Sequence, residues 1–470
     1  MPDFPSLGAV AASIRQGKVS PVEVTRHHLD RIARLDGRLR AFITVDAERA
    51  LAAARRLEDD AGRGQWRGTL HGVPLAFKDL CFIRGLPTSC GTRTAEYFIA
   101  EQDCTAVTRL LAAGAVGLGK LNMTELAIGA LGDNPHHGHA RNPWAVEHCT
   151  GGSSSGSGVA VAAGLTPGAL GTDTGGSIRL PAAFCGITGL KPTYGRVSRA
   201  GAMPLSWSND HLGPMGRTAL DCALMLEAIA GPDPLDATAS SHPVADYVAA
   251  LETPVRGLRV GVPLNFFFQG LDAEMEAGVR AAVATLATLG THVAEVRLPD
   301  PQVLNDITGL ISRSESSALH ARLLRERPQE LDAFTRARLE LGLGVPAYDY
   351  LQALRLRARL ARAFTREVWS EVDVLAVPVI PEPAPSLRAA LEGPLEERIV
   401  RQGRFSRLTR PFNGLGLPAL SLPAGFSAAG LPLAFQLVGR PFDEATVLRL
   451  GHAYQRATDW HTREPDLGSV

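Results

Sequence analysis

The chain has 470 residues, of which 45% are hydrophobic and 20% are charged, and this is typical of a globular protein with a sizeable core. Lysine and arginine together number 48, as do aspartate and glutamate, so the formal charge at pH 7 is zero. This balance argues against a protein whose direct partner is a nucleic acid or an anionic membrane surface.

The N-terminal residues, MPDFPSLGAVAASIRQGK, lack the basic start and apolar core of a secretory signal. No apolar run approaches the length of a membrane span. The six cysteines include no CxxC pair, and we expect reduced, mostly buried thiols. The sequence therefore predicts a cytoplasmic protein with no membrane partner.

The first 120 residues predict alternating helices and strands. Ser20 and Glu23 form a capping box with Pro21 at the first helical position, which predicts a helix to about Leu35. The other elements expected here, in chain order, are a helix over 6–17, a strand over 41–45, a helix over 46–60, a strand ending at Lys78, a helix over 104–113 and a strand over 115–120.

Lys78 ends the apolar run GVPLAF and is one of only four lysines among the 48 basic residues. A buried lysine can lose its proton, whereas an arginine cannot, so Lys78 is a candidate general base. A salt bridge with the adjacent Asp79 is an equally good interpretation of the residues alone. Lys120, in the run Gly-Lys-Leu-Asn, is expected to be structural.

Four histidines, at positions 136, 137, 139 and 148, precede the most unusual stretch of the chain. A metal site needs ligands that converge in a formed structure. The surrounding Asn134, Pro135, Gly138 and Pro143 indicate a loop, so we expect surface histidines rather than metal ligands.

The stretch from Cys149 to Arg196 contains two glycine turns that carry serines, 151–156 and 174–177. Glycine is entropically costly, and several glycines beside serines suggest close approach of backbone N–H groups to a reacting oxygen. Gly175 and Gly176, just before an expected helix start, would direct N–H groups at one point, which suits an oxyanion. A flexible linker fits poorly because apolar residues lie between and after the turns.

The residues 152–156 also match the G-x-S-x-G pattern of α/β-hydrolases. That motif requires a strand immediately before it. Residues 144–150 make a poor strand, so we interpret the match as accidental.

After Arg196 the alternation continues. Trp207 is expected to pack against the protein rather than line a pocket, and Thr218 is expected to cap a helix to Ala230. Two arginine-rich helices are expected at 315–327 and 348–372, with solvated charged faces, and they could cover the mouth of an active site. The remaining expected elements are strands at 260–263, 292–298 and 374–377 and a helix at 272–289. Strands that alternate with helices indicate an α/β fold.

The run GTDTGGSIRLPAAFCGITGLKPTYGR, the pattern GVPxxxKD around Lys78 and the segments at 408–413, 417–423 and 433–443 resemble the amidase signature family. The chain departs from the family at Ser155, where glycine is usual. The resemblance implies one large mixed, mostly parallel β-sheet flanked by helices. It also implies a single domain over 1–470, with a signature core at about 70–230, a variable helical region at about 234–372 and a C-terminal return at about 373–457.

The same resemblance implies the roles of individual residues. Ser177 would be the nucleophile, Ser153, on a cis peptide bond in the family, would relay the proton, and Lys78 would be the general base. The oxyanion hole would consist of the N–H groups of Thr174, Gly175, Gly176 and Ser177. Asp173, Ser154 and Arg179 would support the turn from behind. No metal and no organic cofactor is implied.

The function implied is hydrolysis of a carboxylic acid amide through a serine acyl-enzyme. Two alternatives stay open: the glutaminase (A) subunit of the tRNA-dependent amidotransferase, a member of the same family, and a non-catalytic binding module on this scaffold. The segment from Asn122 to Ala127 differs from those subunits, and Ser406 stands about where their glutamine-recognising acid is expected. The partners predicted are a small-molecule amide, no nucleic acid and no membrane, with a homodimer left open.

Overall fold

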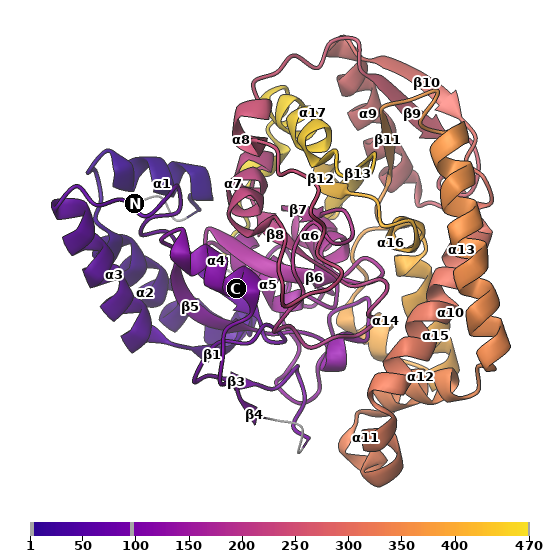
Figure 1. Ribbon diagram of the computed structural model, residues 1–470, viewed down its shortest axis with the longest axis horizontal. Helices are drawn as coiled ribbons and strands as arrows, with labels where there is room; N and C mark the ends of the chain where they lie inside the picture. Colours follow the sequence, from indigo (N-terminus) through magenta and orange to yellow (C-terminus); the bar gives the residue numbers. More distant parts are fainter. Residues whose placement is uncertain (1–3, 95–97, 469–470) are drawn as a thin grey trace.

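The computed structural model describes residues 4–94 and 98–468. Among these residues, eleven strands form one continuous sheet that crosses the molecule (Figure 1). The strands, in spatial order, are β1 (Phe42–Val45), β5 (Val116–Leu121), β2 (Pro74–Lys78), β6 (Gly168–Asp173), β8 (His211–Gly216), β7 (Thr188–Lys191), β12 (Ala419–Phe426), β13 (Pro432–Gly439), β11 (Val374–Pro378), β9 (Arg259–Pro263) and β10 (His292–Val296). A separate ribbon pairs β3 (Pro87–Thr88) with β4 (Phe98–Ile99).

The sheet is mixed, as expected, but its described strands are not mostly parallel. Parallel pairing joins β2 to β5 and β6, and β9 to β10 and β11. The other six pairs of neighbouring strands are antiparallel. Short returns account for the difference: β12 and β13 follow one another through the turn 427–431, and an antiparallel pair needs only such a turn, whereas a parallel pair needs a crossover.

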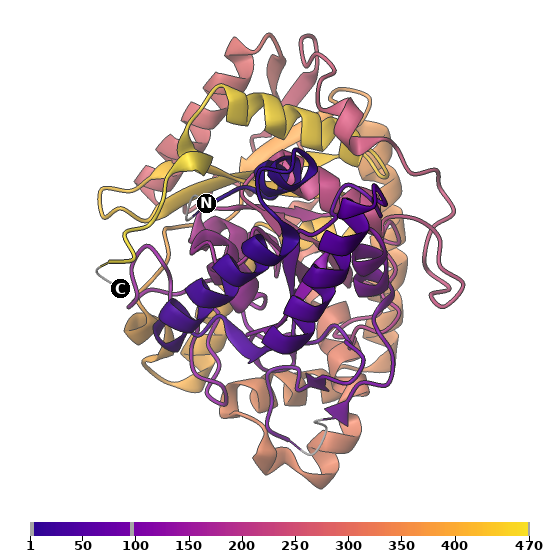
Figure 2. The ribbon, with the colours of Figure 1, turned by 90° about the vertical axis from the view of Figure 1, so that its left-hand side faces the viewer.

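Helices cover both faces of the sheet. Along β8, Met215 packs with α5 and α6 on one face, and Leu212 packs with α7 on the other, because successive strand residues point to opposite sides. Figure 2 shows α2 and α3 side by side over the β1 end of the sheet. The helices around the sheet are α1 (Leu7–Arg15), α2 (Pro21–Leu39), α3 (Ala47–Gly62), α4 (Thr105–Ala112), α5 (Ser155–Ala162), α6 (Arg179–Cys185), α7 (Ala219–Ile229), α8 (Tyr247–Ala250), α9 (Ala273–Thr288) and α17 (Glu444–Arg456).

The capping predictions are confirmed. The Ser20 side chain accepts from the backbone N–H of Glu23, and the Glu23 carboxylate accepts from that of Ser20, which closes the first turn of α2. Thr218 and Asp221 form the same reciprocal pair at the start of α7. Two N–H groups without intrahelical partners are satisfied in each case.

A layer of further helices lies along the other side of the molecule (Figure 1). Its members are α10 (Pro301–Leu319), α11 (Ala321–Glu326), α12 (Ala333–Leu343), α13 (Ala347–Glu367), α14 (Leu387–Leu391), α15 (Leu395–Ser406) and α16 (Arg410–Gly414). The helix expected over 315–327 is in fact the end of α10 followed by α11, because the chain leaves helical geometry at His320. Helix α13 confirms the second predicted helix and packs on α10.

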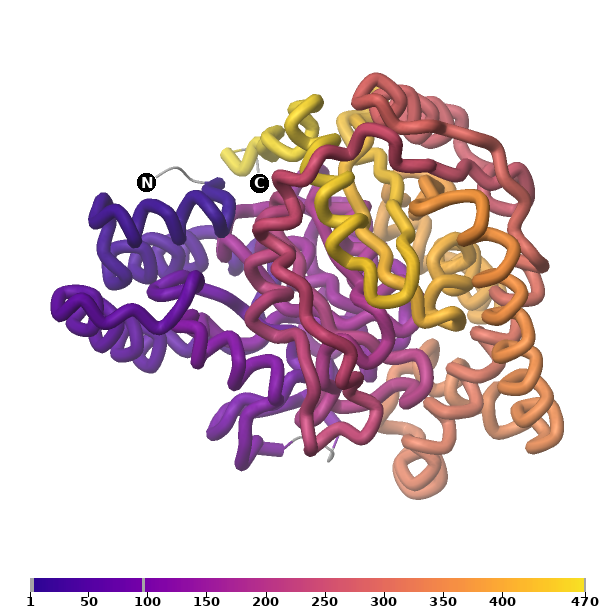
Figure 3. Tube along the Cα trace, turned by 45° about the horizontal axis from the view of Figure 1, so that its top comes forward, coloured from indigo at the N-terminus to yellow at the C-terminus, as the bar shows by residue number. Residues whose placement is uncertain are grey.

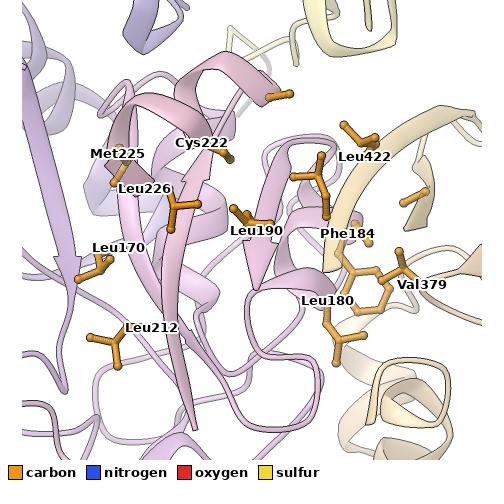
Figure 4. Close-up of a cluster of buried hydrophobic side chains, with 14 of the residues drawn as sticks. Leu170, Leu180, Phe184, Leu190, Leu212, Cys222, Met225, Leu226, Val379 and Leu422 are labelled. Atoms are coloured by element: carbon orange, nitrogen blue, oxygen red, sulfur yellow. The ribbon is translucent and has the colours of Figure 1, made fainter. Parts of the chain in front are cut away.

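The chain then returns to the middle of the sheet. Figure 3 shows the yellow C-terminal segment between the magenta central segment and the orange helices, where β12 and β13 lie between β7 and β11. Figure 4 shows the core that results: Leu170 and Leu190 from strands lie with Met225 and Leu226 of α7, and Phe184 of α6 meets Val379. The signature segment and the C-terminal segment therefore share one hydrophobic core.

Across residues 4–94 and 98–468, no helix combines the length and the apolar character needed to cross a bilayer.

Candidate active site

Lys78 is the last residue of β2 and is fully buried. Its Nζ donates to Ser153 Oγ and to Thr172 Oγ1, both at 2.7 Å. Asp79 does not pair with it; that carboxylate instead faces Lys120 Nζ at 3.1 Å. The structure therefore decides against the salt bridge between neighbours and gives Lys120 the structural role expected of it.

Burial also sets the protonation state of this amine. It lowers the pKa of Lys78 to about 7, and the nearby Cys81 and Asp173 oppose the shift only in part. A substantial fraction of the side chain is therefore uncharged at neutral pH, as a general base must be.

Ser153 and Ser154 lie on the first glycine turn, just before α5. The Gly152–Ser153 peptide bond is cis. The N–H of Ser154 donates to the carbonyl of Ser177 at 3.3 Å, which ties the two turns together. Within the described residues no strand directly precedes Ser153, so the G-x-S-x-G match is accidental, as expected.

The second turn connects β6 to α6 and places Ser177 on a cavity. Gly176 has a φ of +134°, and a Cβ there would lie 2.4 Å from Thr409 Oγ1, so the position requires glycine. The prediction that all four N–H groups of residues 174–177 form the oxyanion hole needs one correction. The Gly176 N–H donates to the Asp173 carboxylate at 2.8 Å and is already used, whereas those of Gly175 and Ser177 have no protein partner in the described chain.

Asp173 and Arg179 stabilise this turn from its buried side. Both are fully buried, and the guanidinium contacts the carboxylate twice, at 3.0 and 3.1 Å. Burial by itself would raise the pKa of Asp173, but Arg179 holds it well below its usual range. Arg179 also donates to Asn413 Oδ1 at 2.7 Å and to Gln436 Oε1 at 2.9 Å, so the C-terminal segment helps to fix the turn.

Three residues that the sequence did not mark as candidates also contact the site. Thr172 is the second acceptor for Lys78. Asp210 accepts from Thr174 Oγ1 at 2.5 Å, and Thr409 Oγ1 donates to the carbonyl of Gly175 at 2.6 Å. Thr172 lies within the GTD run and Thr409 within the segment 408–413, so both could have been suspected, but nothing local marks Asp210.

Trp207 corrects another expectation. Its side chain is 43% exposed and lines a second hollow of about 250 Å³, together with Thr174 and Asp210. Packing was expected, but the residue lies in a loop on the rim of this hollow. It therefore lines a pocket next to the site.

The cavity at Ser177 has a volume of about 290 Å³. Helix α10 lines it with Ser312, Arg313 and Ser316, and α12 contributes Arg338. The expectation that the helical region reaches the mouth of the site is therefore met by α10, whereas α13 packs outside it and supplies none of the lining. The remaining polar lining includes Gln402, Ser406 and Arg410.

The histidine cluster has its own partners. His136 Nε2 lies 2.7 Å from Glu125 Oε1, and His137 Nε2 lies 3.0 Å from the carbonyl of Thr92. Over the residues that the structure describes, no three His, Cys, Asp or Glu side chains are grouped so that they could hold a metal ion.

The chain is similar to known proteins over nearly its whole length. A family model described as Amidase matches residues 23–448. The A subunit of glutamyl-tRNA(Gln) amidotransferase from Roseiflexus sp. is 44% identical over 98% of this chain and 98% of its own. A solved structure described as a vestigial protein complex that reveals the origins of an s-triazine catabolic enzyme superimposes with a TM-score of 0.90, at 35% identity, and covers 96% of this chain and 98% of that chain. The A subunit of the same amidotransferase from Thermotoga maritima superimposes with a TM-score of 0.78, at 30% identity, over 93% of this chain and 91% of that chain.

These relatives correct the prediction about partners. A small-molecule amide was expected, with no nucleic acid and at most a homodimer. Relatives that match over nearly the whole chain are instead named as the A subunit of glutamyl-tRNA(Gln) amidotransferase, and that name includes an aminoacylated tRNA. A net charge of zero is a sum over the whole chain, so it excludes neither a tRNA-bound substrate nor contact through a partner protein.

Proposed function

Because the chain belongs to the amidase family, we propose that it hydrolyses a carboxamide through a serine acyl-enzyme, as the amide-hydrolysing subunit of an amidotransferase. The observation that carries the chemistry is the contact between a fully buried amine and a hydroxyl, Lys78 Nζ to Ser153 Oγ at 2.7 Å, directly behind the turn that bears Ser177. A non-catalytic binding module has no use for a lysine whose pKa is lowered to about 7.

In this proposal Ser177 Oγ attacks the amide carbonyl carbon. Its proton passes to Ser153 Oγ while the Ser153 proton passes to the neutral amine of Lys78. The carbonyl oxygen becomes an oxyanion, which the free N–H groups of Gly175 and Ser177 stabilise. Thr174 supplies a further donor in the same turn, and Asp210 and Thr409 hold that turn in place.

The relay then runs in reverse. Lys78 returns its proton through Ser153 to the leaving nitrogen, the C–N bond breaks, and ammonia leaves the acyl-enzyme. Water attacks the ester by the same route, releases the carboxylic acid and restores Ser177. No step requires an oxidant, a reductant or a cofactor.

The role within a larger assembly rests on the relatives. Eight that match over 97–98% of this chain share one name, which identifies the A subunit of glutamyl-tRNA(Gln) amidotransferase. In such an assembly the ammonia released at Ser177 would amidate the glutamyl group of a charged tRNA on a partner protein. From the sequence alone, the segment at 122–127 and Ser406 are expected to differ from those subunits.

Co-expression tests this role in an assembly. We expect the chain to co-purify with the other amidotransferase subunits encoded in its genome, and the complex to convert glutamyl-tRNA(Gln) to glutaminyl-tRNA(Gln) with an amide donor. The Ser177→Ala complex should do so only with added ammonia. A chain that purifies alone, and tRNA amidation that proceeds with donor despite Ser177→Ala, would contradict the role.

The pH dependence of hydrolysis follows from Lys78. The group must be neutral to accept a proton, and its pKa is lowered to about 7. We expect kcat/KM to fall tenfold per pH unit below about pH 7 and to level off above it. A pH profile measured between pH 5 and 9 checks this; a profile that stays flat down to pH 5 would exclude Lys78 as the base.

A further inference from the structure

Three arginines meet in the cavity that contains Ser177. Arg313 comes from α10, Arg338 from α12 and Arg410 from the first turn of α16. Helix α10 packs against both α12 and α16, which brings together residues that lie almost 100 positions apart. Arg410 is beside the oxyanion turn, since a Cβ on Gly175 would lie 3.9 Å from its Nε.

No carboxylate of the described residues forms an ion pair with these three arginines. Arg410 donates to two neutral acceptors, Asn305 Oδ1 at 2.9 Å and Ser406 Oγ. Neither the guanidinium group of Arg313 nor that of Arg338 forms a hydrogen bond or ion pair with the described residues, and Arg313 Nε is buried without a partner. Like charges that are held together on a half-buried cavity without a paired counter-ion cost free energy, which a bound anion would recover.

The surroundings of the guanidinium groups support the same view. Burial, followed by the charge of Arg313, lowers the pKa of Arg338 to about 10. Burial, Arg338 and Arg313 lower the pKa of Arg410 to about 10 as well, and Asp306 opposes this. Asp306 is outside the cavity lining, where its partners include Gln302 and Asn305.

The described lining also contains no aspartate or glutamate. An ammonium group on a substrate would therefore find three cations and no counter-charge. Arginine, by contrast, has the planar donor arrangement that matches a carboxylate. The hydroxyls of Ser312, Ser316 and Ser406 are further donors on the same wall.

We propose that the amide hydrolysed at Ser177 is the monoamide of a dicarboxylic acid, whose free carboxylate binds to Arg313, Arg338 and Arg410 and whose α-amino group, if it has one, is not recognised. This inference rests on the proposed amide hydrolysis and names its substrate class. Glutamine belongs to the class through its carboxylate, but the cavity favours the analogue without the amine.

Four amides that share one scaffold test the proposal. Glutamine carries a free carboxylate and an amine, and glutaramate carries only the carboxylate. 4-Aminobutanamide carries only the amine, and butanamide carries neither group. We expect glutaramate to have the highest kcat/KM, at least equal to that of glutamine, and loss of the carboxylate to cost about 10²-fold, as for a lost charge-assisted bond. If glutamine exceeds glutaramate by more than tenfold, the amine is recognised and the proposal is wrong.

Arg338→Gln tests the arginines directly, because Arg338 has no described protein partner to lose. We expect a rise in KM of about 10–10²-fold for glutaramate and little change in kcat/KM for butanamide. Arg336→Gln is the matched control, because Arg336 lies two residues away on α12, is exposed and, among the described residues, forms an ion pair only with Glu340, at 3.5 Å. An equal loss on all four amides would show a structural role and overturn the proposal.

Calorimetry separates this inference from the proposed function. Glutaramate should bind the Ser177→Ala variant, and adding Arg338→Gln should weaken that binding at least tenfold. If no amide is hydrolysed but this binding is seen, the proposed function fails and the carboxylate site stands. If hydrolysis is seen but glutaramate does not bind, the carboxylate site fails alone.

Discussion

Ser177→Ala is expected to abolish amide hydrolysis, with a loss on the order of 10⁶-fold in kcat, the size seen when a serine nucleophile is removed from a hydrolase. In the proposed mechanism the Ser153 hydroxyl, which Lys78 contacts, takes the proton of Ser177, and the free N–H groups of Gly175 and Ser177 stabilise the oxyanion. Ammonia release from glutaramate and glutamine measures the loss.

Two controls make the result specific. Labelling by a fluorophosphonate probe should disappear together with activity, since the probe reports the same activated oxygen. Ser370→Ala, an exposed serine after α13, should keep both. The Ser177 side chain is partly exposed on the cavity, so the variant should unfold at the same temperature as the parent. Hydrolysis at the parental rate by a folded Ser177→Ala protein would refute the nucleophile.

Lys78→Met is expected to reduce kcat/KM by about 10³–10⁴-fold, which is the contribution of a general base at the upper end of its range. Methionine has a similar length and no titratable group, so the cavity left behind is small. Lys18→Met, at an exposed position, is the matched control and should be fully active. Full activity in Lys78→Met would leave Ser177 without its base and contradict the relay.

Stability provides a second readout of the same residue. The folded pKa of Lys78 is about 7, below its ordinary value of 10.5, so between these values the unfolded chain binds more protons than the folded one. The wild-type protein should therefore gain stability as the pH rises from about 7 to 10.5. Lys78→Met should lack this gain, which thermal unfolding at several pH values will show.

Much of the fold and of the candidate site could be predicted because the signals are local. A capping box involves residues three positions apart, so the starts of α2 and α7 were readable from Ser20 and Thr218. The serine and glycine turns at 151–156 and 174–177 lie within one short stretch. Lys78 was recognisable from the apolar run before it, although the residues alone left its salt bridge to Asp79 open.

The remaining features depend on packing between distant segments. The order of the strands, and their largely antiparallel pairing, follow from which hairpins and crossovers pack together. Whether Asp79 pairs with Lys78 or with Lys120 was decided by β5 lying beside β2. The use of the Gly176 N–H by Asp173 required the side-chain geometry of the turn.

The sequence by itself determined the α/β class and the two serine turns, since each depends on neighbouring residues, but it left Lys78 open between a general base and a salt bridge with Asp79. The tertiary structure alone decided what the cavity can bind. Arg313, Arg338 and Arg410 look like ordinary members of an arginine-rich chain, and only the packing of α10, α12 and α16 brings them into one cavity without a counter-ion. Electrostatic complementarity depends on distances in space, which no pattern along the chain records.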